Sequence, residues 1–237
     1  MQKSMIKLLS VADVVSLTNA SFGFLAILIL VSNIIPSEEL RIRLSLSFIL
    51  IALLIDGLDG IVARKIRKSE LGDHMEALAD MTSLGIAPSF FIYSIYSSSV
   101  SYCIYYHSYL IIGIILFFIM NIIRLASFHK LKEKDYFIGL PASASTIILI
   151  TLTFLEVEFL YILLVIIIIS FALISKIHFL KTDYKINAVA AVLIILTLIF
   201  GKNYSGITII VLLLAIAAYV IIGPIYLWKN KKKEYKK

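Results

Sequence analysis

Eight long apolar runs constrain the fold of this chain more than any other feature of its sequence. A membrane-spanning helix needs about 20 mostly apolar residues, and the fifth and seventh runs are short for that length. We therefore expect an all-α polytopic membrane protein with about eight transmembrane helices. The runs are Ser16–Ile35, Leu44–Ala63, Met75–Tyr96, Tyr109–Phe128, Pro141–Leu155, Phe159–Ile174, Ala188–Phe200 and Ile207–Leu227.

The composition agrees with a bilayer as the solvent. Of the 237 residues, 61% are hydrophobic and 16% are charged, whereas about 25% of a soluble domain is charged. So few charges cannot cover the apolar surface of a soluble protein of this size. We find no internal repeat and no separate soluble domain, and we expect one transmembrane domain over residues 1–228 and a basic cytoplasmic tail over 229–237.

The distribution of basic residues predicts the orientation. If the N-terminus is cytoplasmic, eight spans return the C-terminus to the same side, and only Arg41, Arg43 and Lys202 of the 22 Lys and Arg residues lie outside. This satisfies the positive-inside rule, so we expect a cell-membrane protein with both termini in the cytoplasm. The first run has no convincing cleavage site after it, and we interpret it as a retained segment. The net charge of +7 indicates membrane lipid as the partner, and not nucleic acid, because the basic residues lie between apolar runs and at the C-terminus.

Carboxylates lie where the second run ends and the third begins. Asp56 and Asp59 share one helix face, as do Glu76 and Asp80 on the next helix. The short connection Lys65–Leu71 should make these helices antiparallel neighbours, with the two acidic pairs at similar depth. A carboxylate within a membrane costs about 2.5–3.5 kcal/mol, and four together need counter-cations. Hard divalent cations with oxygen ligands suit such a cluster, so we expect Mg²⁺ or Mn²⁺, with room for two ions.

Small residues accompany the carboxylates. Gly57, Gly60 and Ala63 follow Asp56, and Gly72 opens the next helix. Each lets a backbone or a flat ligand such as a nucleotide come close, although a glycine weakens a helix by about 1 kcal/mol relative to alanine. The alternative interpretation is close packing of membrane helices, and both can hold at once.

The pattern Asp56-x-x-Asp59-Gly60-x-x-Ala63-Arg64, followed by Gly72-x-x-x-Glu76-x-x-x-Asp80, resembles the signature of the CDP-alcohol phosphotransferase family. The family usually has Asp at the position of Glu76. The competing interpretation of Glu76 is a capping box with Asp73 as the N-cap. We favour a ligand role for Glu76, because it lies one turn before Asp80, and we assign Asp73 to the cap.

Further segments resemble the phosphatidylserine synthase branch of that family. The resemblance covers about the first 185 residues, and the last two spans carry no motif. The segments are Ser83–Pro88, Asn121–Phe128, Phe137–Ser145, Ser175–Ile177 and, loosely, Thr18, Asn19 and Gly23.

The resemblance implies a six-helix core and metal-dependent transfer of a phosphatidyl-type group, diacyl or archaetidyl, from a CDP-lipid to the hydroxyl of L-serine, with release of CMP. This reaction belongs to phospholipid biosynthesis. It also implies an active site at the cytoplasmic face and a homodimer. In the implied site, Asp80 takes the proton as the catalytic residue. The implied metal ligands are Asp56, Asp59, Glu76 and Asp80, and the implied nucleotide-binding residues are Gly57, Gly60, Ala63, Arg64 and Gly72.

The roles of two basic residues and the identity of the acceptor stay open. Arg124 and Lys176 are candidates for binding the lipid phosphate or the acceptor carboxylate, or are edge cations that snorkel. The position of Arg124 inside its run favours a binding role for it. Other acceptors, such as inositol phosphate or glycerol phosphate, would keep the same chemistry. A cation or proton transporter would also bury carboxylates, but no inverted repeat is evident.

Overall fold

The computed structural model describes most of the chain. It covers residues 8–65, 69–128, 130, 131, 133, 136–181, 184–200 and 206–234, while the side chains of 58–65, 184, 185 and 230–234 lie outside the description.

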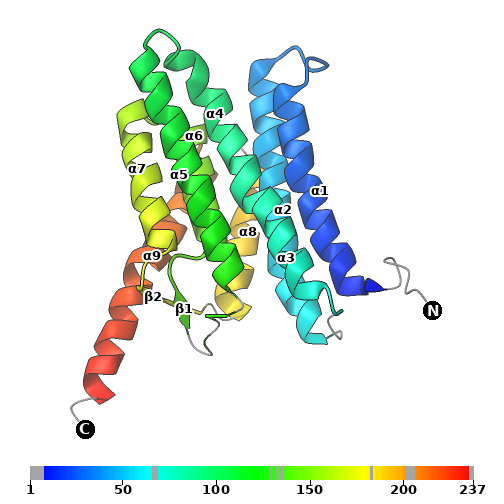
Figure 1. Ribbon diagram of the computed structural model, residues 1–237, viewed down its shortest axis with the longest axis vertical. Helices are drawn as coiled ribbons and strands as arrows, with labels where there is room; N and C mark the ends of the chain where they lie inside the picture. The colour runs from blue at the N-terminus through cyan, green and yellow to red at the C-terminus, as the bar shows by residue number, and fades with distance from the viewer. Residues whose placement is uncertain are drawn as a thin grey trace.

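The described helices run back and forth through one bundle, with both chain ends at the same end of it (Figure 1). Three segments follow one another without a break and form a single pass: α3 (Gly72–Asp80), the π-helical turn η2 (Met81–Ile86) and α4 (Ala87–Ser99). Each of the eight predicted apolar runs coincides with a helical pass, which confirms the expected all-α polytopic fold. The other passes are α1 (Val11–Val31), α2 (Glu38–Lys65), α5 (Ile104–Phe128), α6 (Ala142–Phe154), α7 (Phe159–Leu173), α8 (Tyr184–Phe200) and α9 (Ile207–Glu234).

Four of the described passes are long and apolar enough to cross a bilayer alone. They are α1, the continuous pass Gly72–Ser99, α5 and the Ile207–Lys229 part of α9. The helices α6, α7 and the apolar part of α8 are shorter. Most of α6 is buried, so this short helix lies inside the bundle among longer neighbours. The chain is thus a multi-pass membrane protein.

Apolar side chains cover the outside of the bundle as well as its interior. Phe24 on α1, Ile112 on α5 and Leu164 on α7 are each more than half exposed. In water such surfaces would be costly, but in a bilayer they face lipid and cost nothing.

The N-terminal helix has a complete local start signal. Ser10 is the N-cap of α1, and its side chain accepts a hydrogen bond from the backbone N–H of Asp13. The Asp13 carboxylate accepts a hydrogen bond from the Ser10 backbone N–H in return, at 2.6 Å. This capping box satisfies donors that a helix start would otherwise leave unpaired.

A small sheet closes the end of the bundle that carries both termini (Figure 1). Strand β1 (Tyr136–Ile138) pairs antiparallel with β2 (His178–Leu180), an addition to the all-α expectation. Gly139 follows β1 with a φ of 78°, and a Cβ there would lie 2.3 Å from the carbonyl oxygen of Leu173. Only glycine permits this close approach of the connection to the end of α7.

Two predictions about local structure need correction or extension. The N-cap of α3 is Leu71, with no side-chain cap hydrogen bond, so the assignment of Asp73 as the cap is wrong. Leu71 already has helical dihedrals, and its N–H donates a hydrogen bond to the side-chain oxygen of Ser69 at 3.1 Å. Asp73 lies in the first turn of α3, where a negative charge still favours the helix dipole. At the other end of the chain, α9 continues to Glu234, so most of the predicted tail is helical.

Candidate active site

The predicted acidic residues lie on two helices, α2 and α3, that both pack against α1. Asp56 on α2 and Glu76 and Asp80 on α3 are all partly buried. Helix α1 packs along α2 and also against α3 and η2, while α2 packs against η2 and α4. The second and third passes are therefore neighbours through η2 and α4, while the similar depth of the two acidic pairs stays a prediction.

The described side chains do not by themselves make a closed metal site. Within the described residues, no group of three His, Cys, Asp or Glu side chains is arranged to hold an ion. The side chain of Asp59, the fourth predicted ligand, lies outside the description, as do those of Gly60, Ala63 and Arg64. The predicted donor set consists only of carboxylates, and its chemistry fits a hard divalent cation.

Asp80 has a partner that the sequence did not predict. Asn19 on α1 is 1% exposed, and its Nδ2 donates a hydrogen bond to Oδ1 of Asp80 at 3.1 Å. One turn further along α1, a Cβ on Gly23 would lie 2.7 Å from the Cα of Ser83. Gly23 thus allows α1 to approach η2 closely enough for Asn19 to reach the carboxylate. The only sequence signal was the loose resemblance around Thr18 and Asn19.

The turn that follows Asp80 is π-helical, a geometry often found at functional sites. Pro88 has no N–H and cannot donate to the carbonyl of Leu84, four residues earlier. The Oγ1 of Thr146 on α6 donates to that carbonyl at 2.8 Å instead. The segment Ser83–Pro88, recognised in the sequence only as a resemblance, therefore links the third pass to α6.

The two described glycines of the predicted nucleotide site differ in their surroundings. Gly57 is exposed, and a Cβ there would meet nothing within 4 Å. Among the described residues, no neighbouring helix packs closely against Gly57. Gly72 is buried and is the first residue of α3.

Arg124 is buried and anchored, so it is not an edge cation. It is 5% exposed, its Nε donates to the carbonyl oxygen of Leu140 at 3.0 Å, and its guanidinium carbon lies 5.3 Å from the centre of the Phe128 ring. The backbone N–H of Leu140 is itself bonded to Ala172 at 2.9 Å. The segment around Gly139 and Leu140 thus positions the guanidinium. Lys176, by contrast, lies exposed in the turn after α7.

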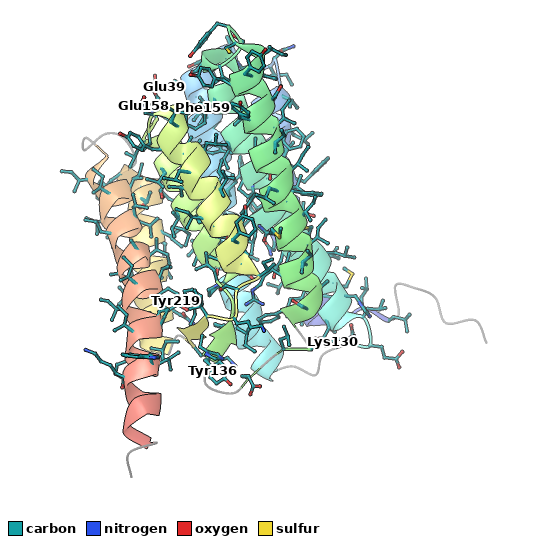
Figure 2. The ribbon with its side chains drawn as sticks, turned by 60° about the vertical axis from the view of Figure 1, so that its left-hand side comes forward. Glu39, Lys130, Tyr136, Glu158, Phe159 and Tyr219 are labelled. Atoms are coloured by element: carbon teal, nitrogen blue, oxygen red, sulfur yellow. The ribbon has the colours of Figure 1, made fainter. Side chains whose placement is uncertain are left out.

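A cavity of about 700 Å³ lies away from these residues, at the other end of the bundle. Figure 2 shows Glu39, Glu158 and Phe159, which line it, at the end opposite Tyr136 of β1. Its walls come from the start of α2, the end of α4 and the connection between α6 and α7. It lies away from the acidic ends of α2 and α3, and no residue of the predicted site lines it.

Comparison with known proteins agrees with the resemblance. The family described as CDP-alcohol phosphatidyltransferase matches residues 9–174. A CDP-diacylglycerol--serine O-phosphatidyltransferase of Methanocaldococcus jannaschii is 30% identical over 181 residues, which are 76% of this chain and 78% of that protein. The enzyme of the same name from Bacillus subtilis is 29% identical over 170 residues, or 70% of this chain and 86% of that protein. An archaetidylserine synthase of Methanothermobacter thermautotrophicus is 34% identical over 95 residues, 39% of this chain and 38% of that protein. This chain is a membrane enzyme that belongs to the CDP-alcohol phosphatidyltransferase family.

Proposed function

We propose that this enzyme transfers a phosphatidyl-type group from a CDP-lipid to the hydroxyl of L-serine and releases CMP. The observation that carries the proposal is Asp80, a partly buried carboxylate on an acidic membrane helix, oriented by the buried amide of Asn19. The names of the relatives in M. jannaschii and B. subtilis support serine as the acceptor. The lipid part is diacyl or archaetidyl, and the archaetidylserine synthase relative supports testing both.

In the proposed reaction, a bond forms between the serine oxygen and the lipid-side phosphorus, and the bond from that phosphorus to the CMP oxygen breaks. The hydroxyl proton passes to the Asp80 carboxylate, and CMP leaves with the bonding electron pair. A carboxylate is a weak base toward an alcohol, so proton transfer must accompany bond formation. The hydrogen bond from Asn19 holds Asp80 in one orientation for this step.

Asp56, Asp59, Glu76 and Asp80 would hold one or two Mg²⁺ or Mn²⁺ ions. Ions bound there would stabilise negative charge on the pyrophosphate oxygens and orient the reacting groups. The longer side chain of Glu76 would adjust the ion position relative to an aspartate.

The nucleotide would lie over Gly57, where the open space leaves room for it, together with Gly60, Ala63, Arg64 and Gly72. Arg124 would bind the lipid-side phosphate or the acceptor carboxylate, because a guanidinium binds such groups through two parallel hydrogen bonds. Lys176 is the weaker candidate for this role because it is exposed. The enzyme would act as a homodimer in the cell membrane, with this end of the bundle in the cytoplasm.

The test uses purified full-length protein in detergent with Mg²⁺ or Mn²⁺, L-serine, and CDP-diacylglycerol or CDP-archaeol. We expect serine-dependent CMP release that is lost with EDTA and in Asp80→Asn, and the better donor identifies the lipid. Release of CMP only with inositol phosphate or glycerol phosphate would overturn serine as the acceptor. A folded protein that releases no CMP with any of these alcohols would overturn the proposed reaction.

A further inference from the structure

Asn121 on α5 is a buried amide without a hydrogen-bond partner. Its side chain is 0% exposed, and neither its Nδ2 nor its Oδ1 has a partner among the described residues. A buried polar group that lacks a partner destabilises the folded protein, because no hydrogen bond offsets its loss of contact with water. Leucine would fill a similar volume on this apolar helix without that cost, so the folded protein alone gives no reason for an amide here.

Six other described side-chain atoms are buried without a partner: Asn19 Oδ1, Arg43 Nε, Ser45 Oγ, His107 Nδ1, Thr153 Oγ1 and Thr208 Oγ1. Asn121 differs from all of them because both polar atoms of its side chain lack a partner among the described residues. Ser45 and Thr153 each leave one buried hydroxyl without a partner, and a hydroxyl can rotate toward a carbonyl of its own helix. A primary amide presents two donors and an acceptor in a fixed plane, and helix backbone cannot satisfy both sides of it. The side-chain amide of Asn121 therefore suits a ligand that offers both a hydrogen-bond donor and a hydrogen-bond acceptor.

The position of Asn121 links it to the proposed site. A Cβ on Gly85 would lie 3.8 Å from the Cβ of Asn121 and 2.7 Å from the methyl carbon of Met81. Asn121 thus borders η2, the turn that begins directly after Asp80. Arg124 lies one turn along α5, on the same face as Asn121, and is also buried.

We propose that Asn121 recognises the acceptor, an amino acid whose ammonium and carboxylate groups share the carbon next to the one that carries the reacting hydroxyl. The amide oxygen accepts a hydrogen bond from the ammonium group, and the amide nitrogen donates to the carboxylate. Arg124 supplies the positive charge that the carboxylate needs. The Met81 side chain is unbranched and flexible, and it moves aside to admit the acceptor. This inference rests on the proposed function and adds the residue that selects the acceptor.

The test compares Asn121→Leu with Thr153→Val, which removes a buried, unpartnered hydroxyl on α6. In Asn121→Leu we expect the KM for L-serine to rise about tenfold or more, as expected for lost hydrogen bonds to charged groups. The KM for the CDP-lipid stays within about twofold of that of the unmodified enzyme. The melting temperature in detergent stays the same or rises, because an unsatisfied amide has been removed. Thr153→Val leaves the KM for serine unchanged.

A second measurement does not depend on turnover. L-serine should raise the melting temperature of the unmodified protein and of Thr153→Val, but not that of Asn121→Leu. An unchanged KM for serine in folded Asn121→Leu, or a lower melting temperature with unchanged serine binding, would overturn the inference and leave the proposed function standing. Serine binding through Asn121 without CMP release would overturn the proposed function alone. An unmodified protein that neither binds serine nor releases CMP with it would overturn both.

Discussion

The side-chain amide of Asn19 on α1 donates a hydrogen bond to Oδ1 of Asp80, which is 61 residues further along the chain and 3.1 Å away. Both residues lie where α1 packs against the third pass. The first helix, which carries none of the acidic motif, thereby orients the proposed catalytic carboxylate.

Replacing Asn19 by leucine should lower serine-dependent CMP release by about ten- to hundredfold. A hydrogen bond to a charged group contributes about 1.5–3 kcal/mol, and each 1.36 kcal/mol corresponds to a factor of ten in rate. The control is Ser21→Ala on the same helix, because the exposed Ser21 hydroxyl donates only to the Leu17 carbonyl at 2.7 Å. Equal activity in both variants would show that Asp80 does not need the amide of Asn19.

Replacing Gly57 by alanine should separate binding from stability. A Cβ there would meet nothing within 4 Å among the described residues, and alanine improves a helix by about 1 kcal/mol. We therefore expect an unchanged or higher melting temperature, together with a several-fold higher KM for the CDP-lipid, because the methyl group enters the proposed nucleotide space.

Gly23→Ala is the matched control for Gly57→Ala. Its Cβ would lie 2.7 Å from the Cα of Ser83, a backbone atom that cannot move without shifting η2. Overpacking of this kind costs about 1–3 kcal/mol, so this variant should melt at a lower temperature. If Gly57→Ala also melts lower with normal lipid binding, Gly57 serves packing and not the nucleotide.

Arg124 should not be replaceable by lysine. Arg124→Lys keeps the charge but loses the planar fork and its stacking on Phe128, which lies 5.3 Å from the guanidinium carbon. We expect both Arg124→Lys and Arg124→Met to lose at least about tenfold in kcat/KM, since each removes charge-assisted hydrogen bonds. Steady-state CMP release measures this loss, and a Lys176→Met variant provides the comparison. Full activity in Arg124→Lys would mean that a positive charge at this position is sufficient.

Much of the fold was readable from the sequence, because a bilayer imposes apolar runs of nearly fixed length on spanning helices. The acidic motif was readable for a similar reason, since carboxylates in apolar helices are costly and stand out. The partner of Asp80 was not readable, because an asparagine on α1 shows no local pattern that connects it with a residue 61 positions away. The role of Leu140 was hidden as well, because any residue type carries the carbonyl oxygen that anchors Arg124.

Gly139 should tolerate alanine much less well than Gly206 does. Both have positive φ angles, 78° and 70°, which cost a non-glycine residue about 1–2 kcal/mol. At Gly139 a Cβ would also lie 2.3 Å from the Leu173 carbonyl oxygen, whereas at Gly206 the nearest atom is a Leu155 methyl at 3.5 Å. Gly139→Ala should therefore melt at a clearly lower temperature than Gly206→Ala. Equal melting temperatures would show that the connection after β1 moves freely away from α7.

The single cysteine offers a direct test of the orientation in the membrane. Cys103 is a free, partly buried thiol in the connection between α4 and α5. This connection lies at the end of the bundle opposite the start of α1 and the end of α9 (Figure 1). If the termini are cytoplasmic, a membrane-impermeant maleimide should label Cys103 in intact cells. In a Cys103→Ser background, Lys130→Cys should react only after permeabilisation, because Lys130 is exposed and lies toward the other end (Figure 2).

Labelling of Cys103 in detergent serves as the control for thiol reactivity. If the thiol reacts in detergent, absence of labelling in intact cells shows that the membrane protects it. Labelling of Lys130→Cys in intact cells, with Cys103 protected until permeabilisation, would invert the orientation. The acidic ends of α2 and α3 lie at the same end of the bundle as the two termini (Figure 1). The inverted result would therefore place the proposed site outside the cell, away from a cytoplasmic supply of serine and CDP-lipid, and the proposed reaction would lose its substrates.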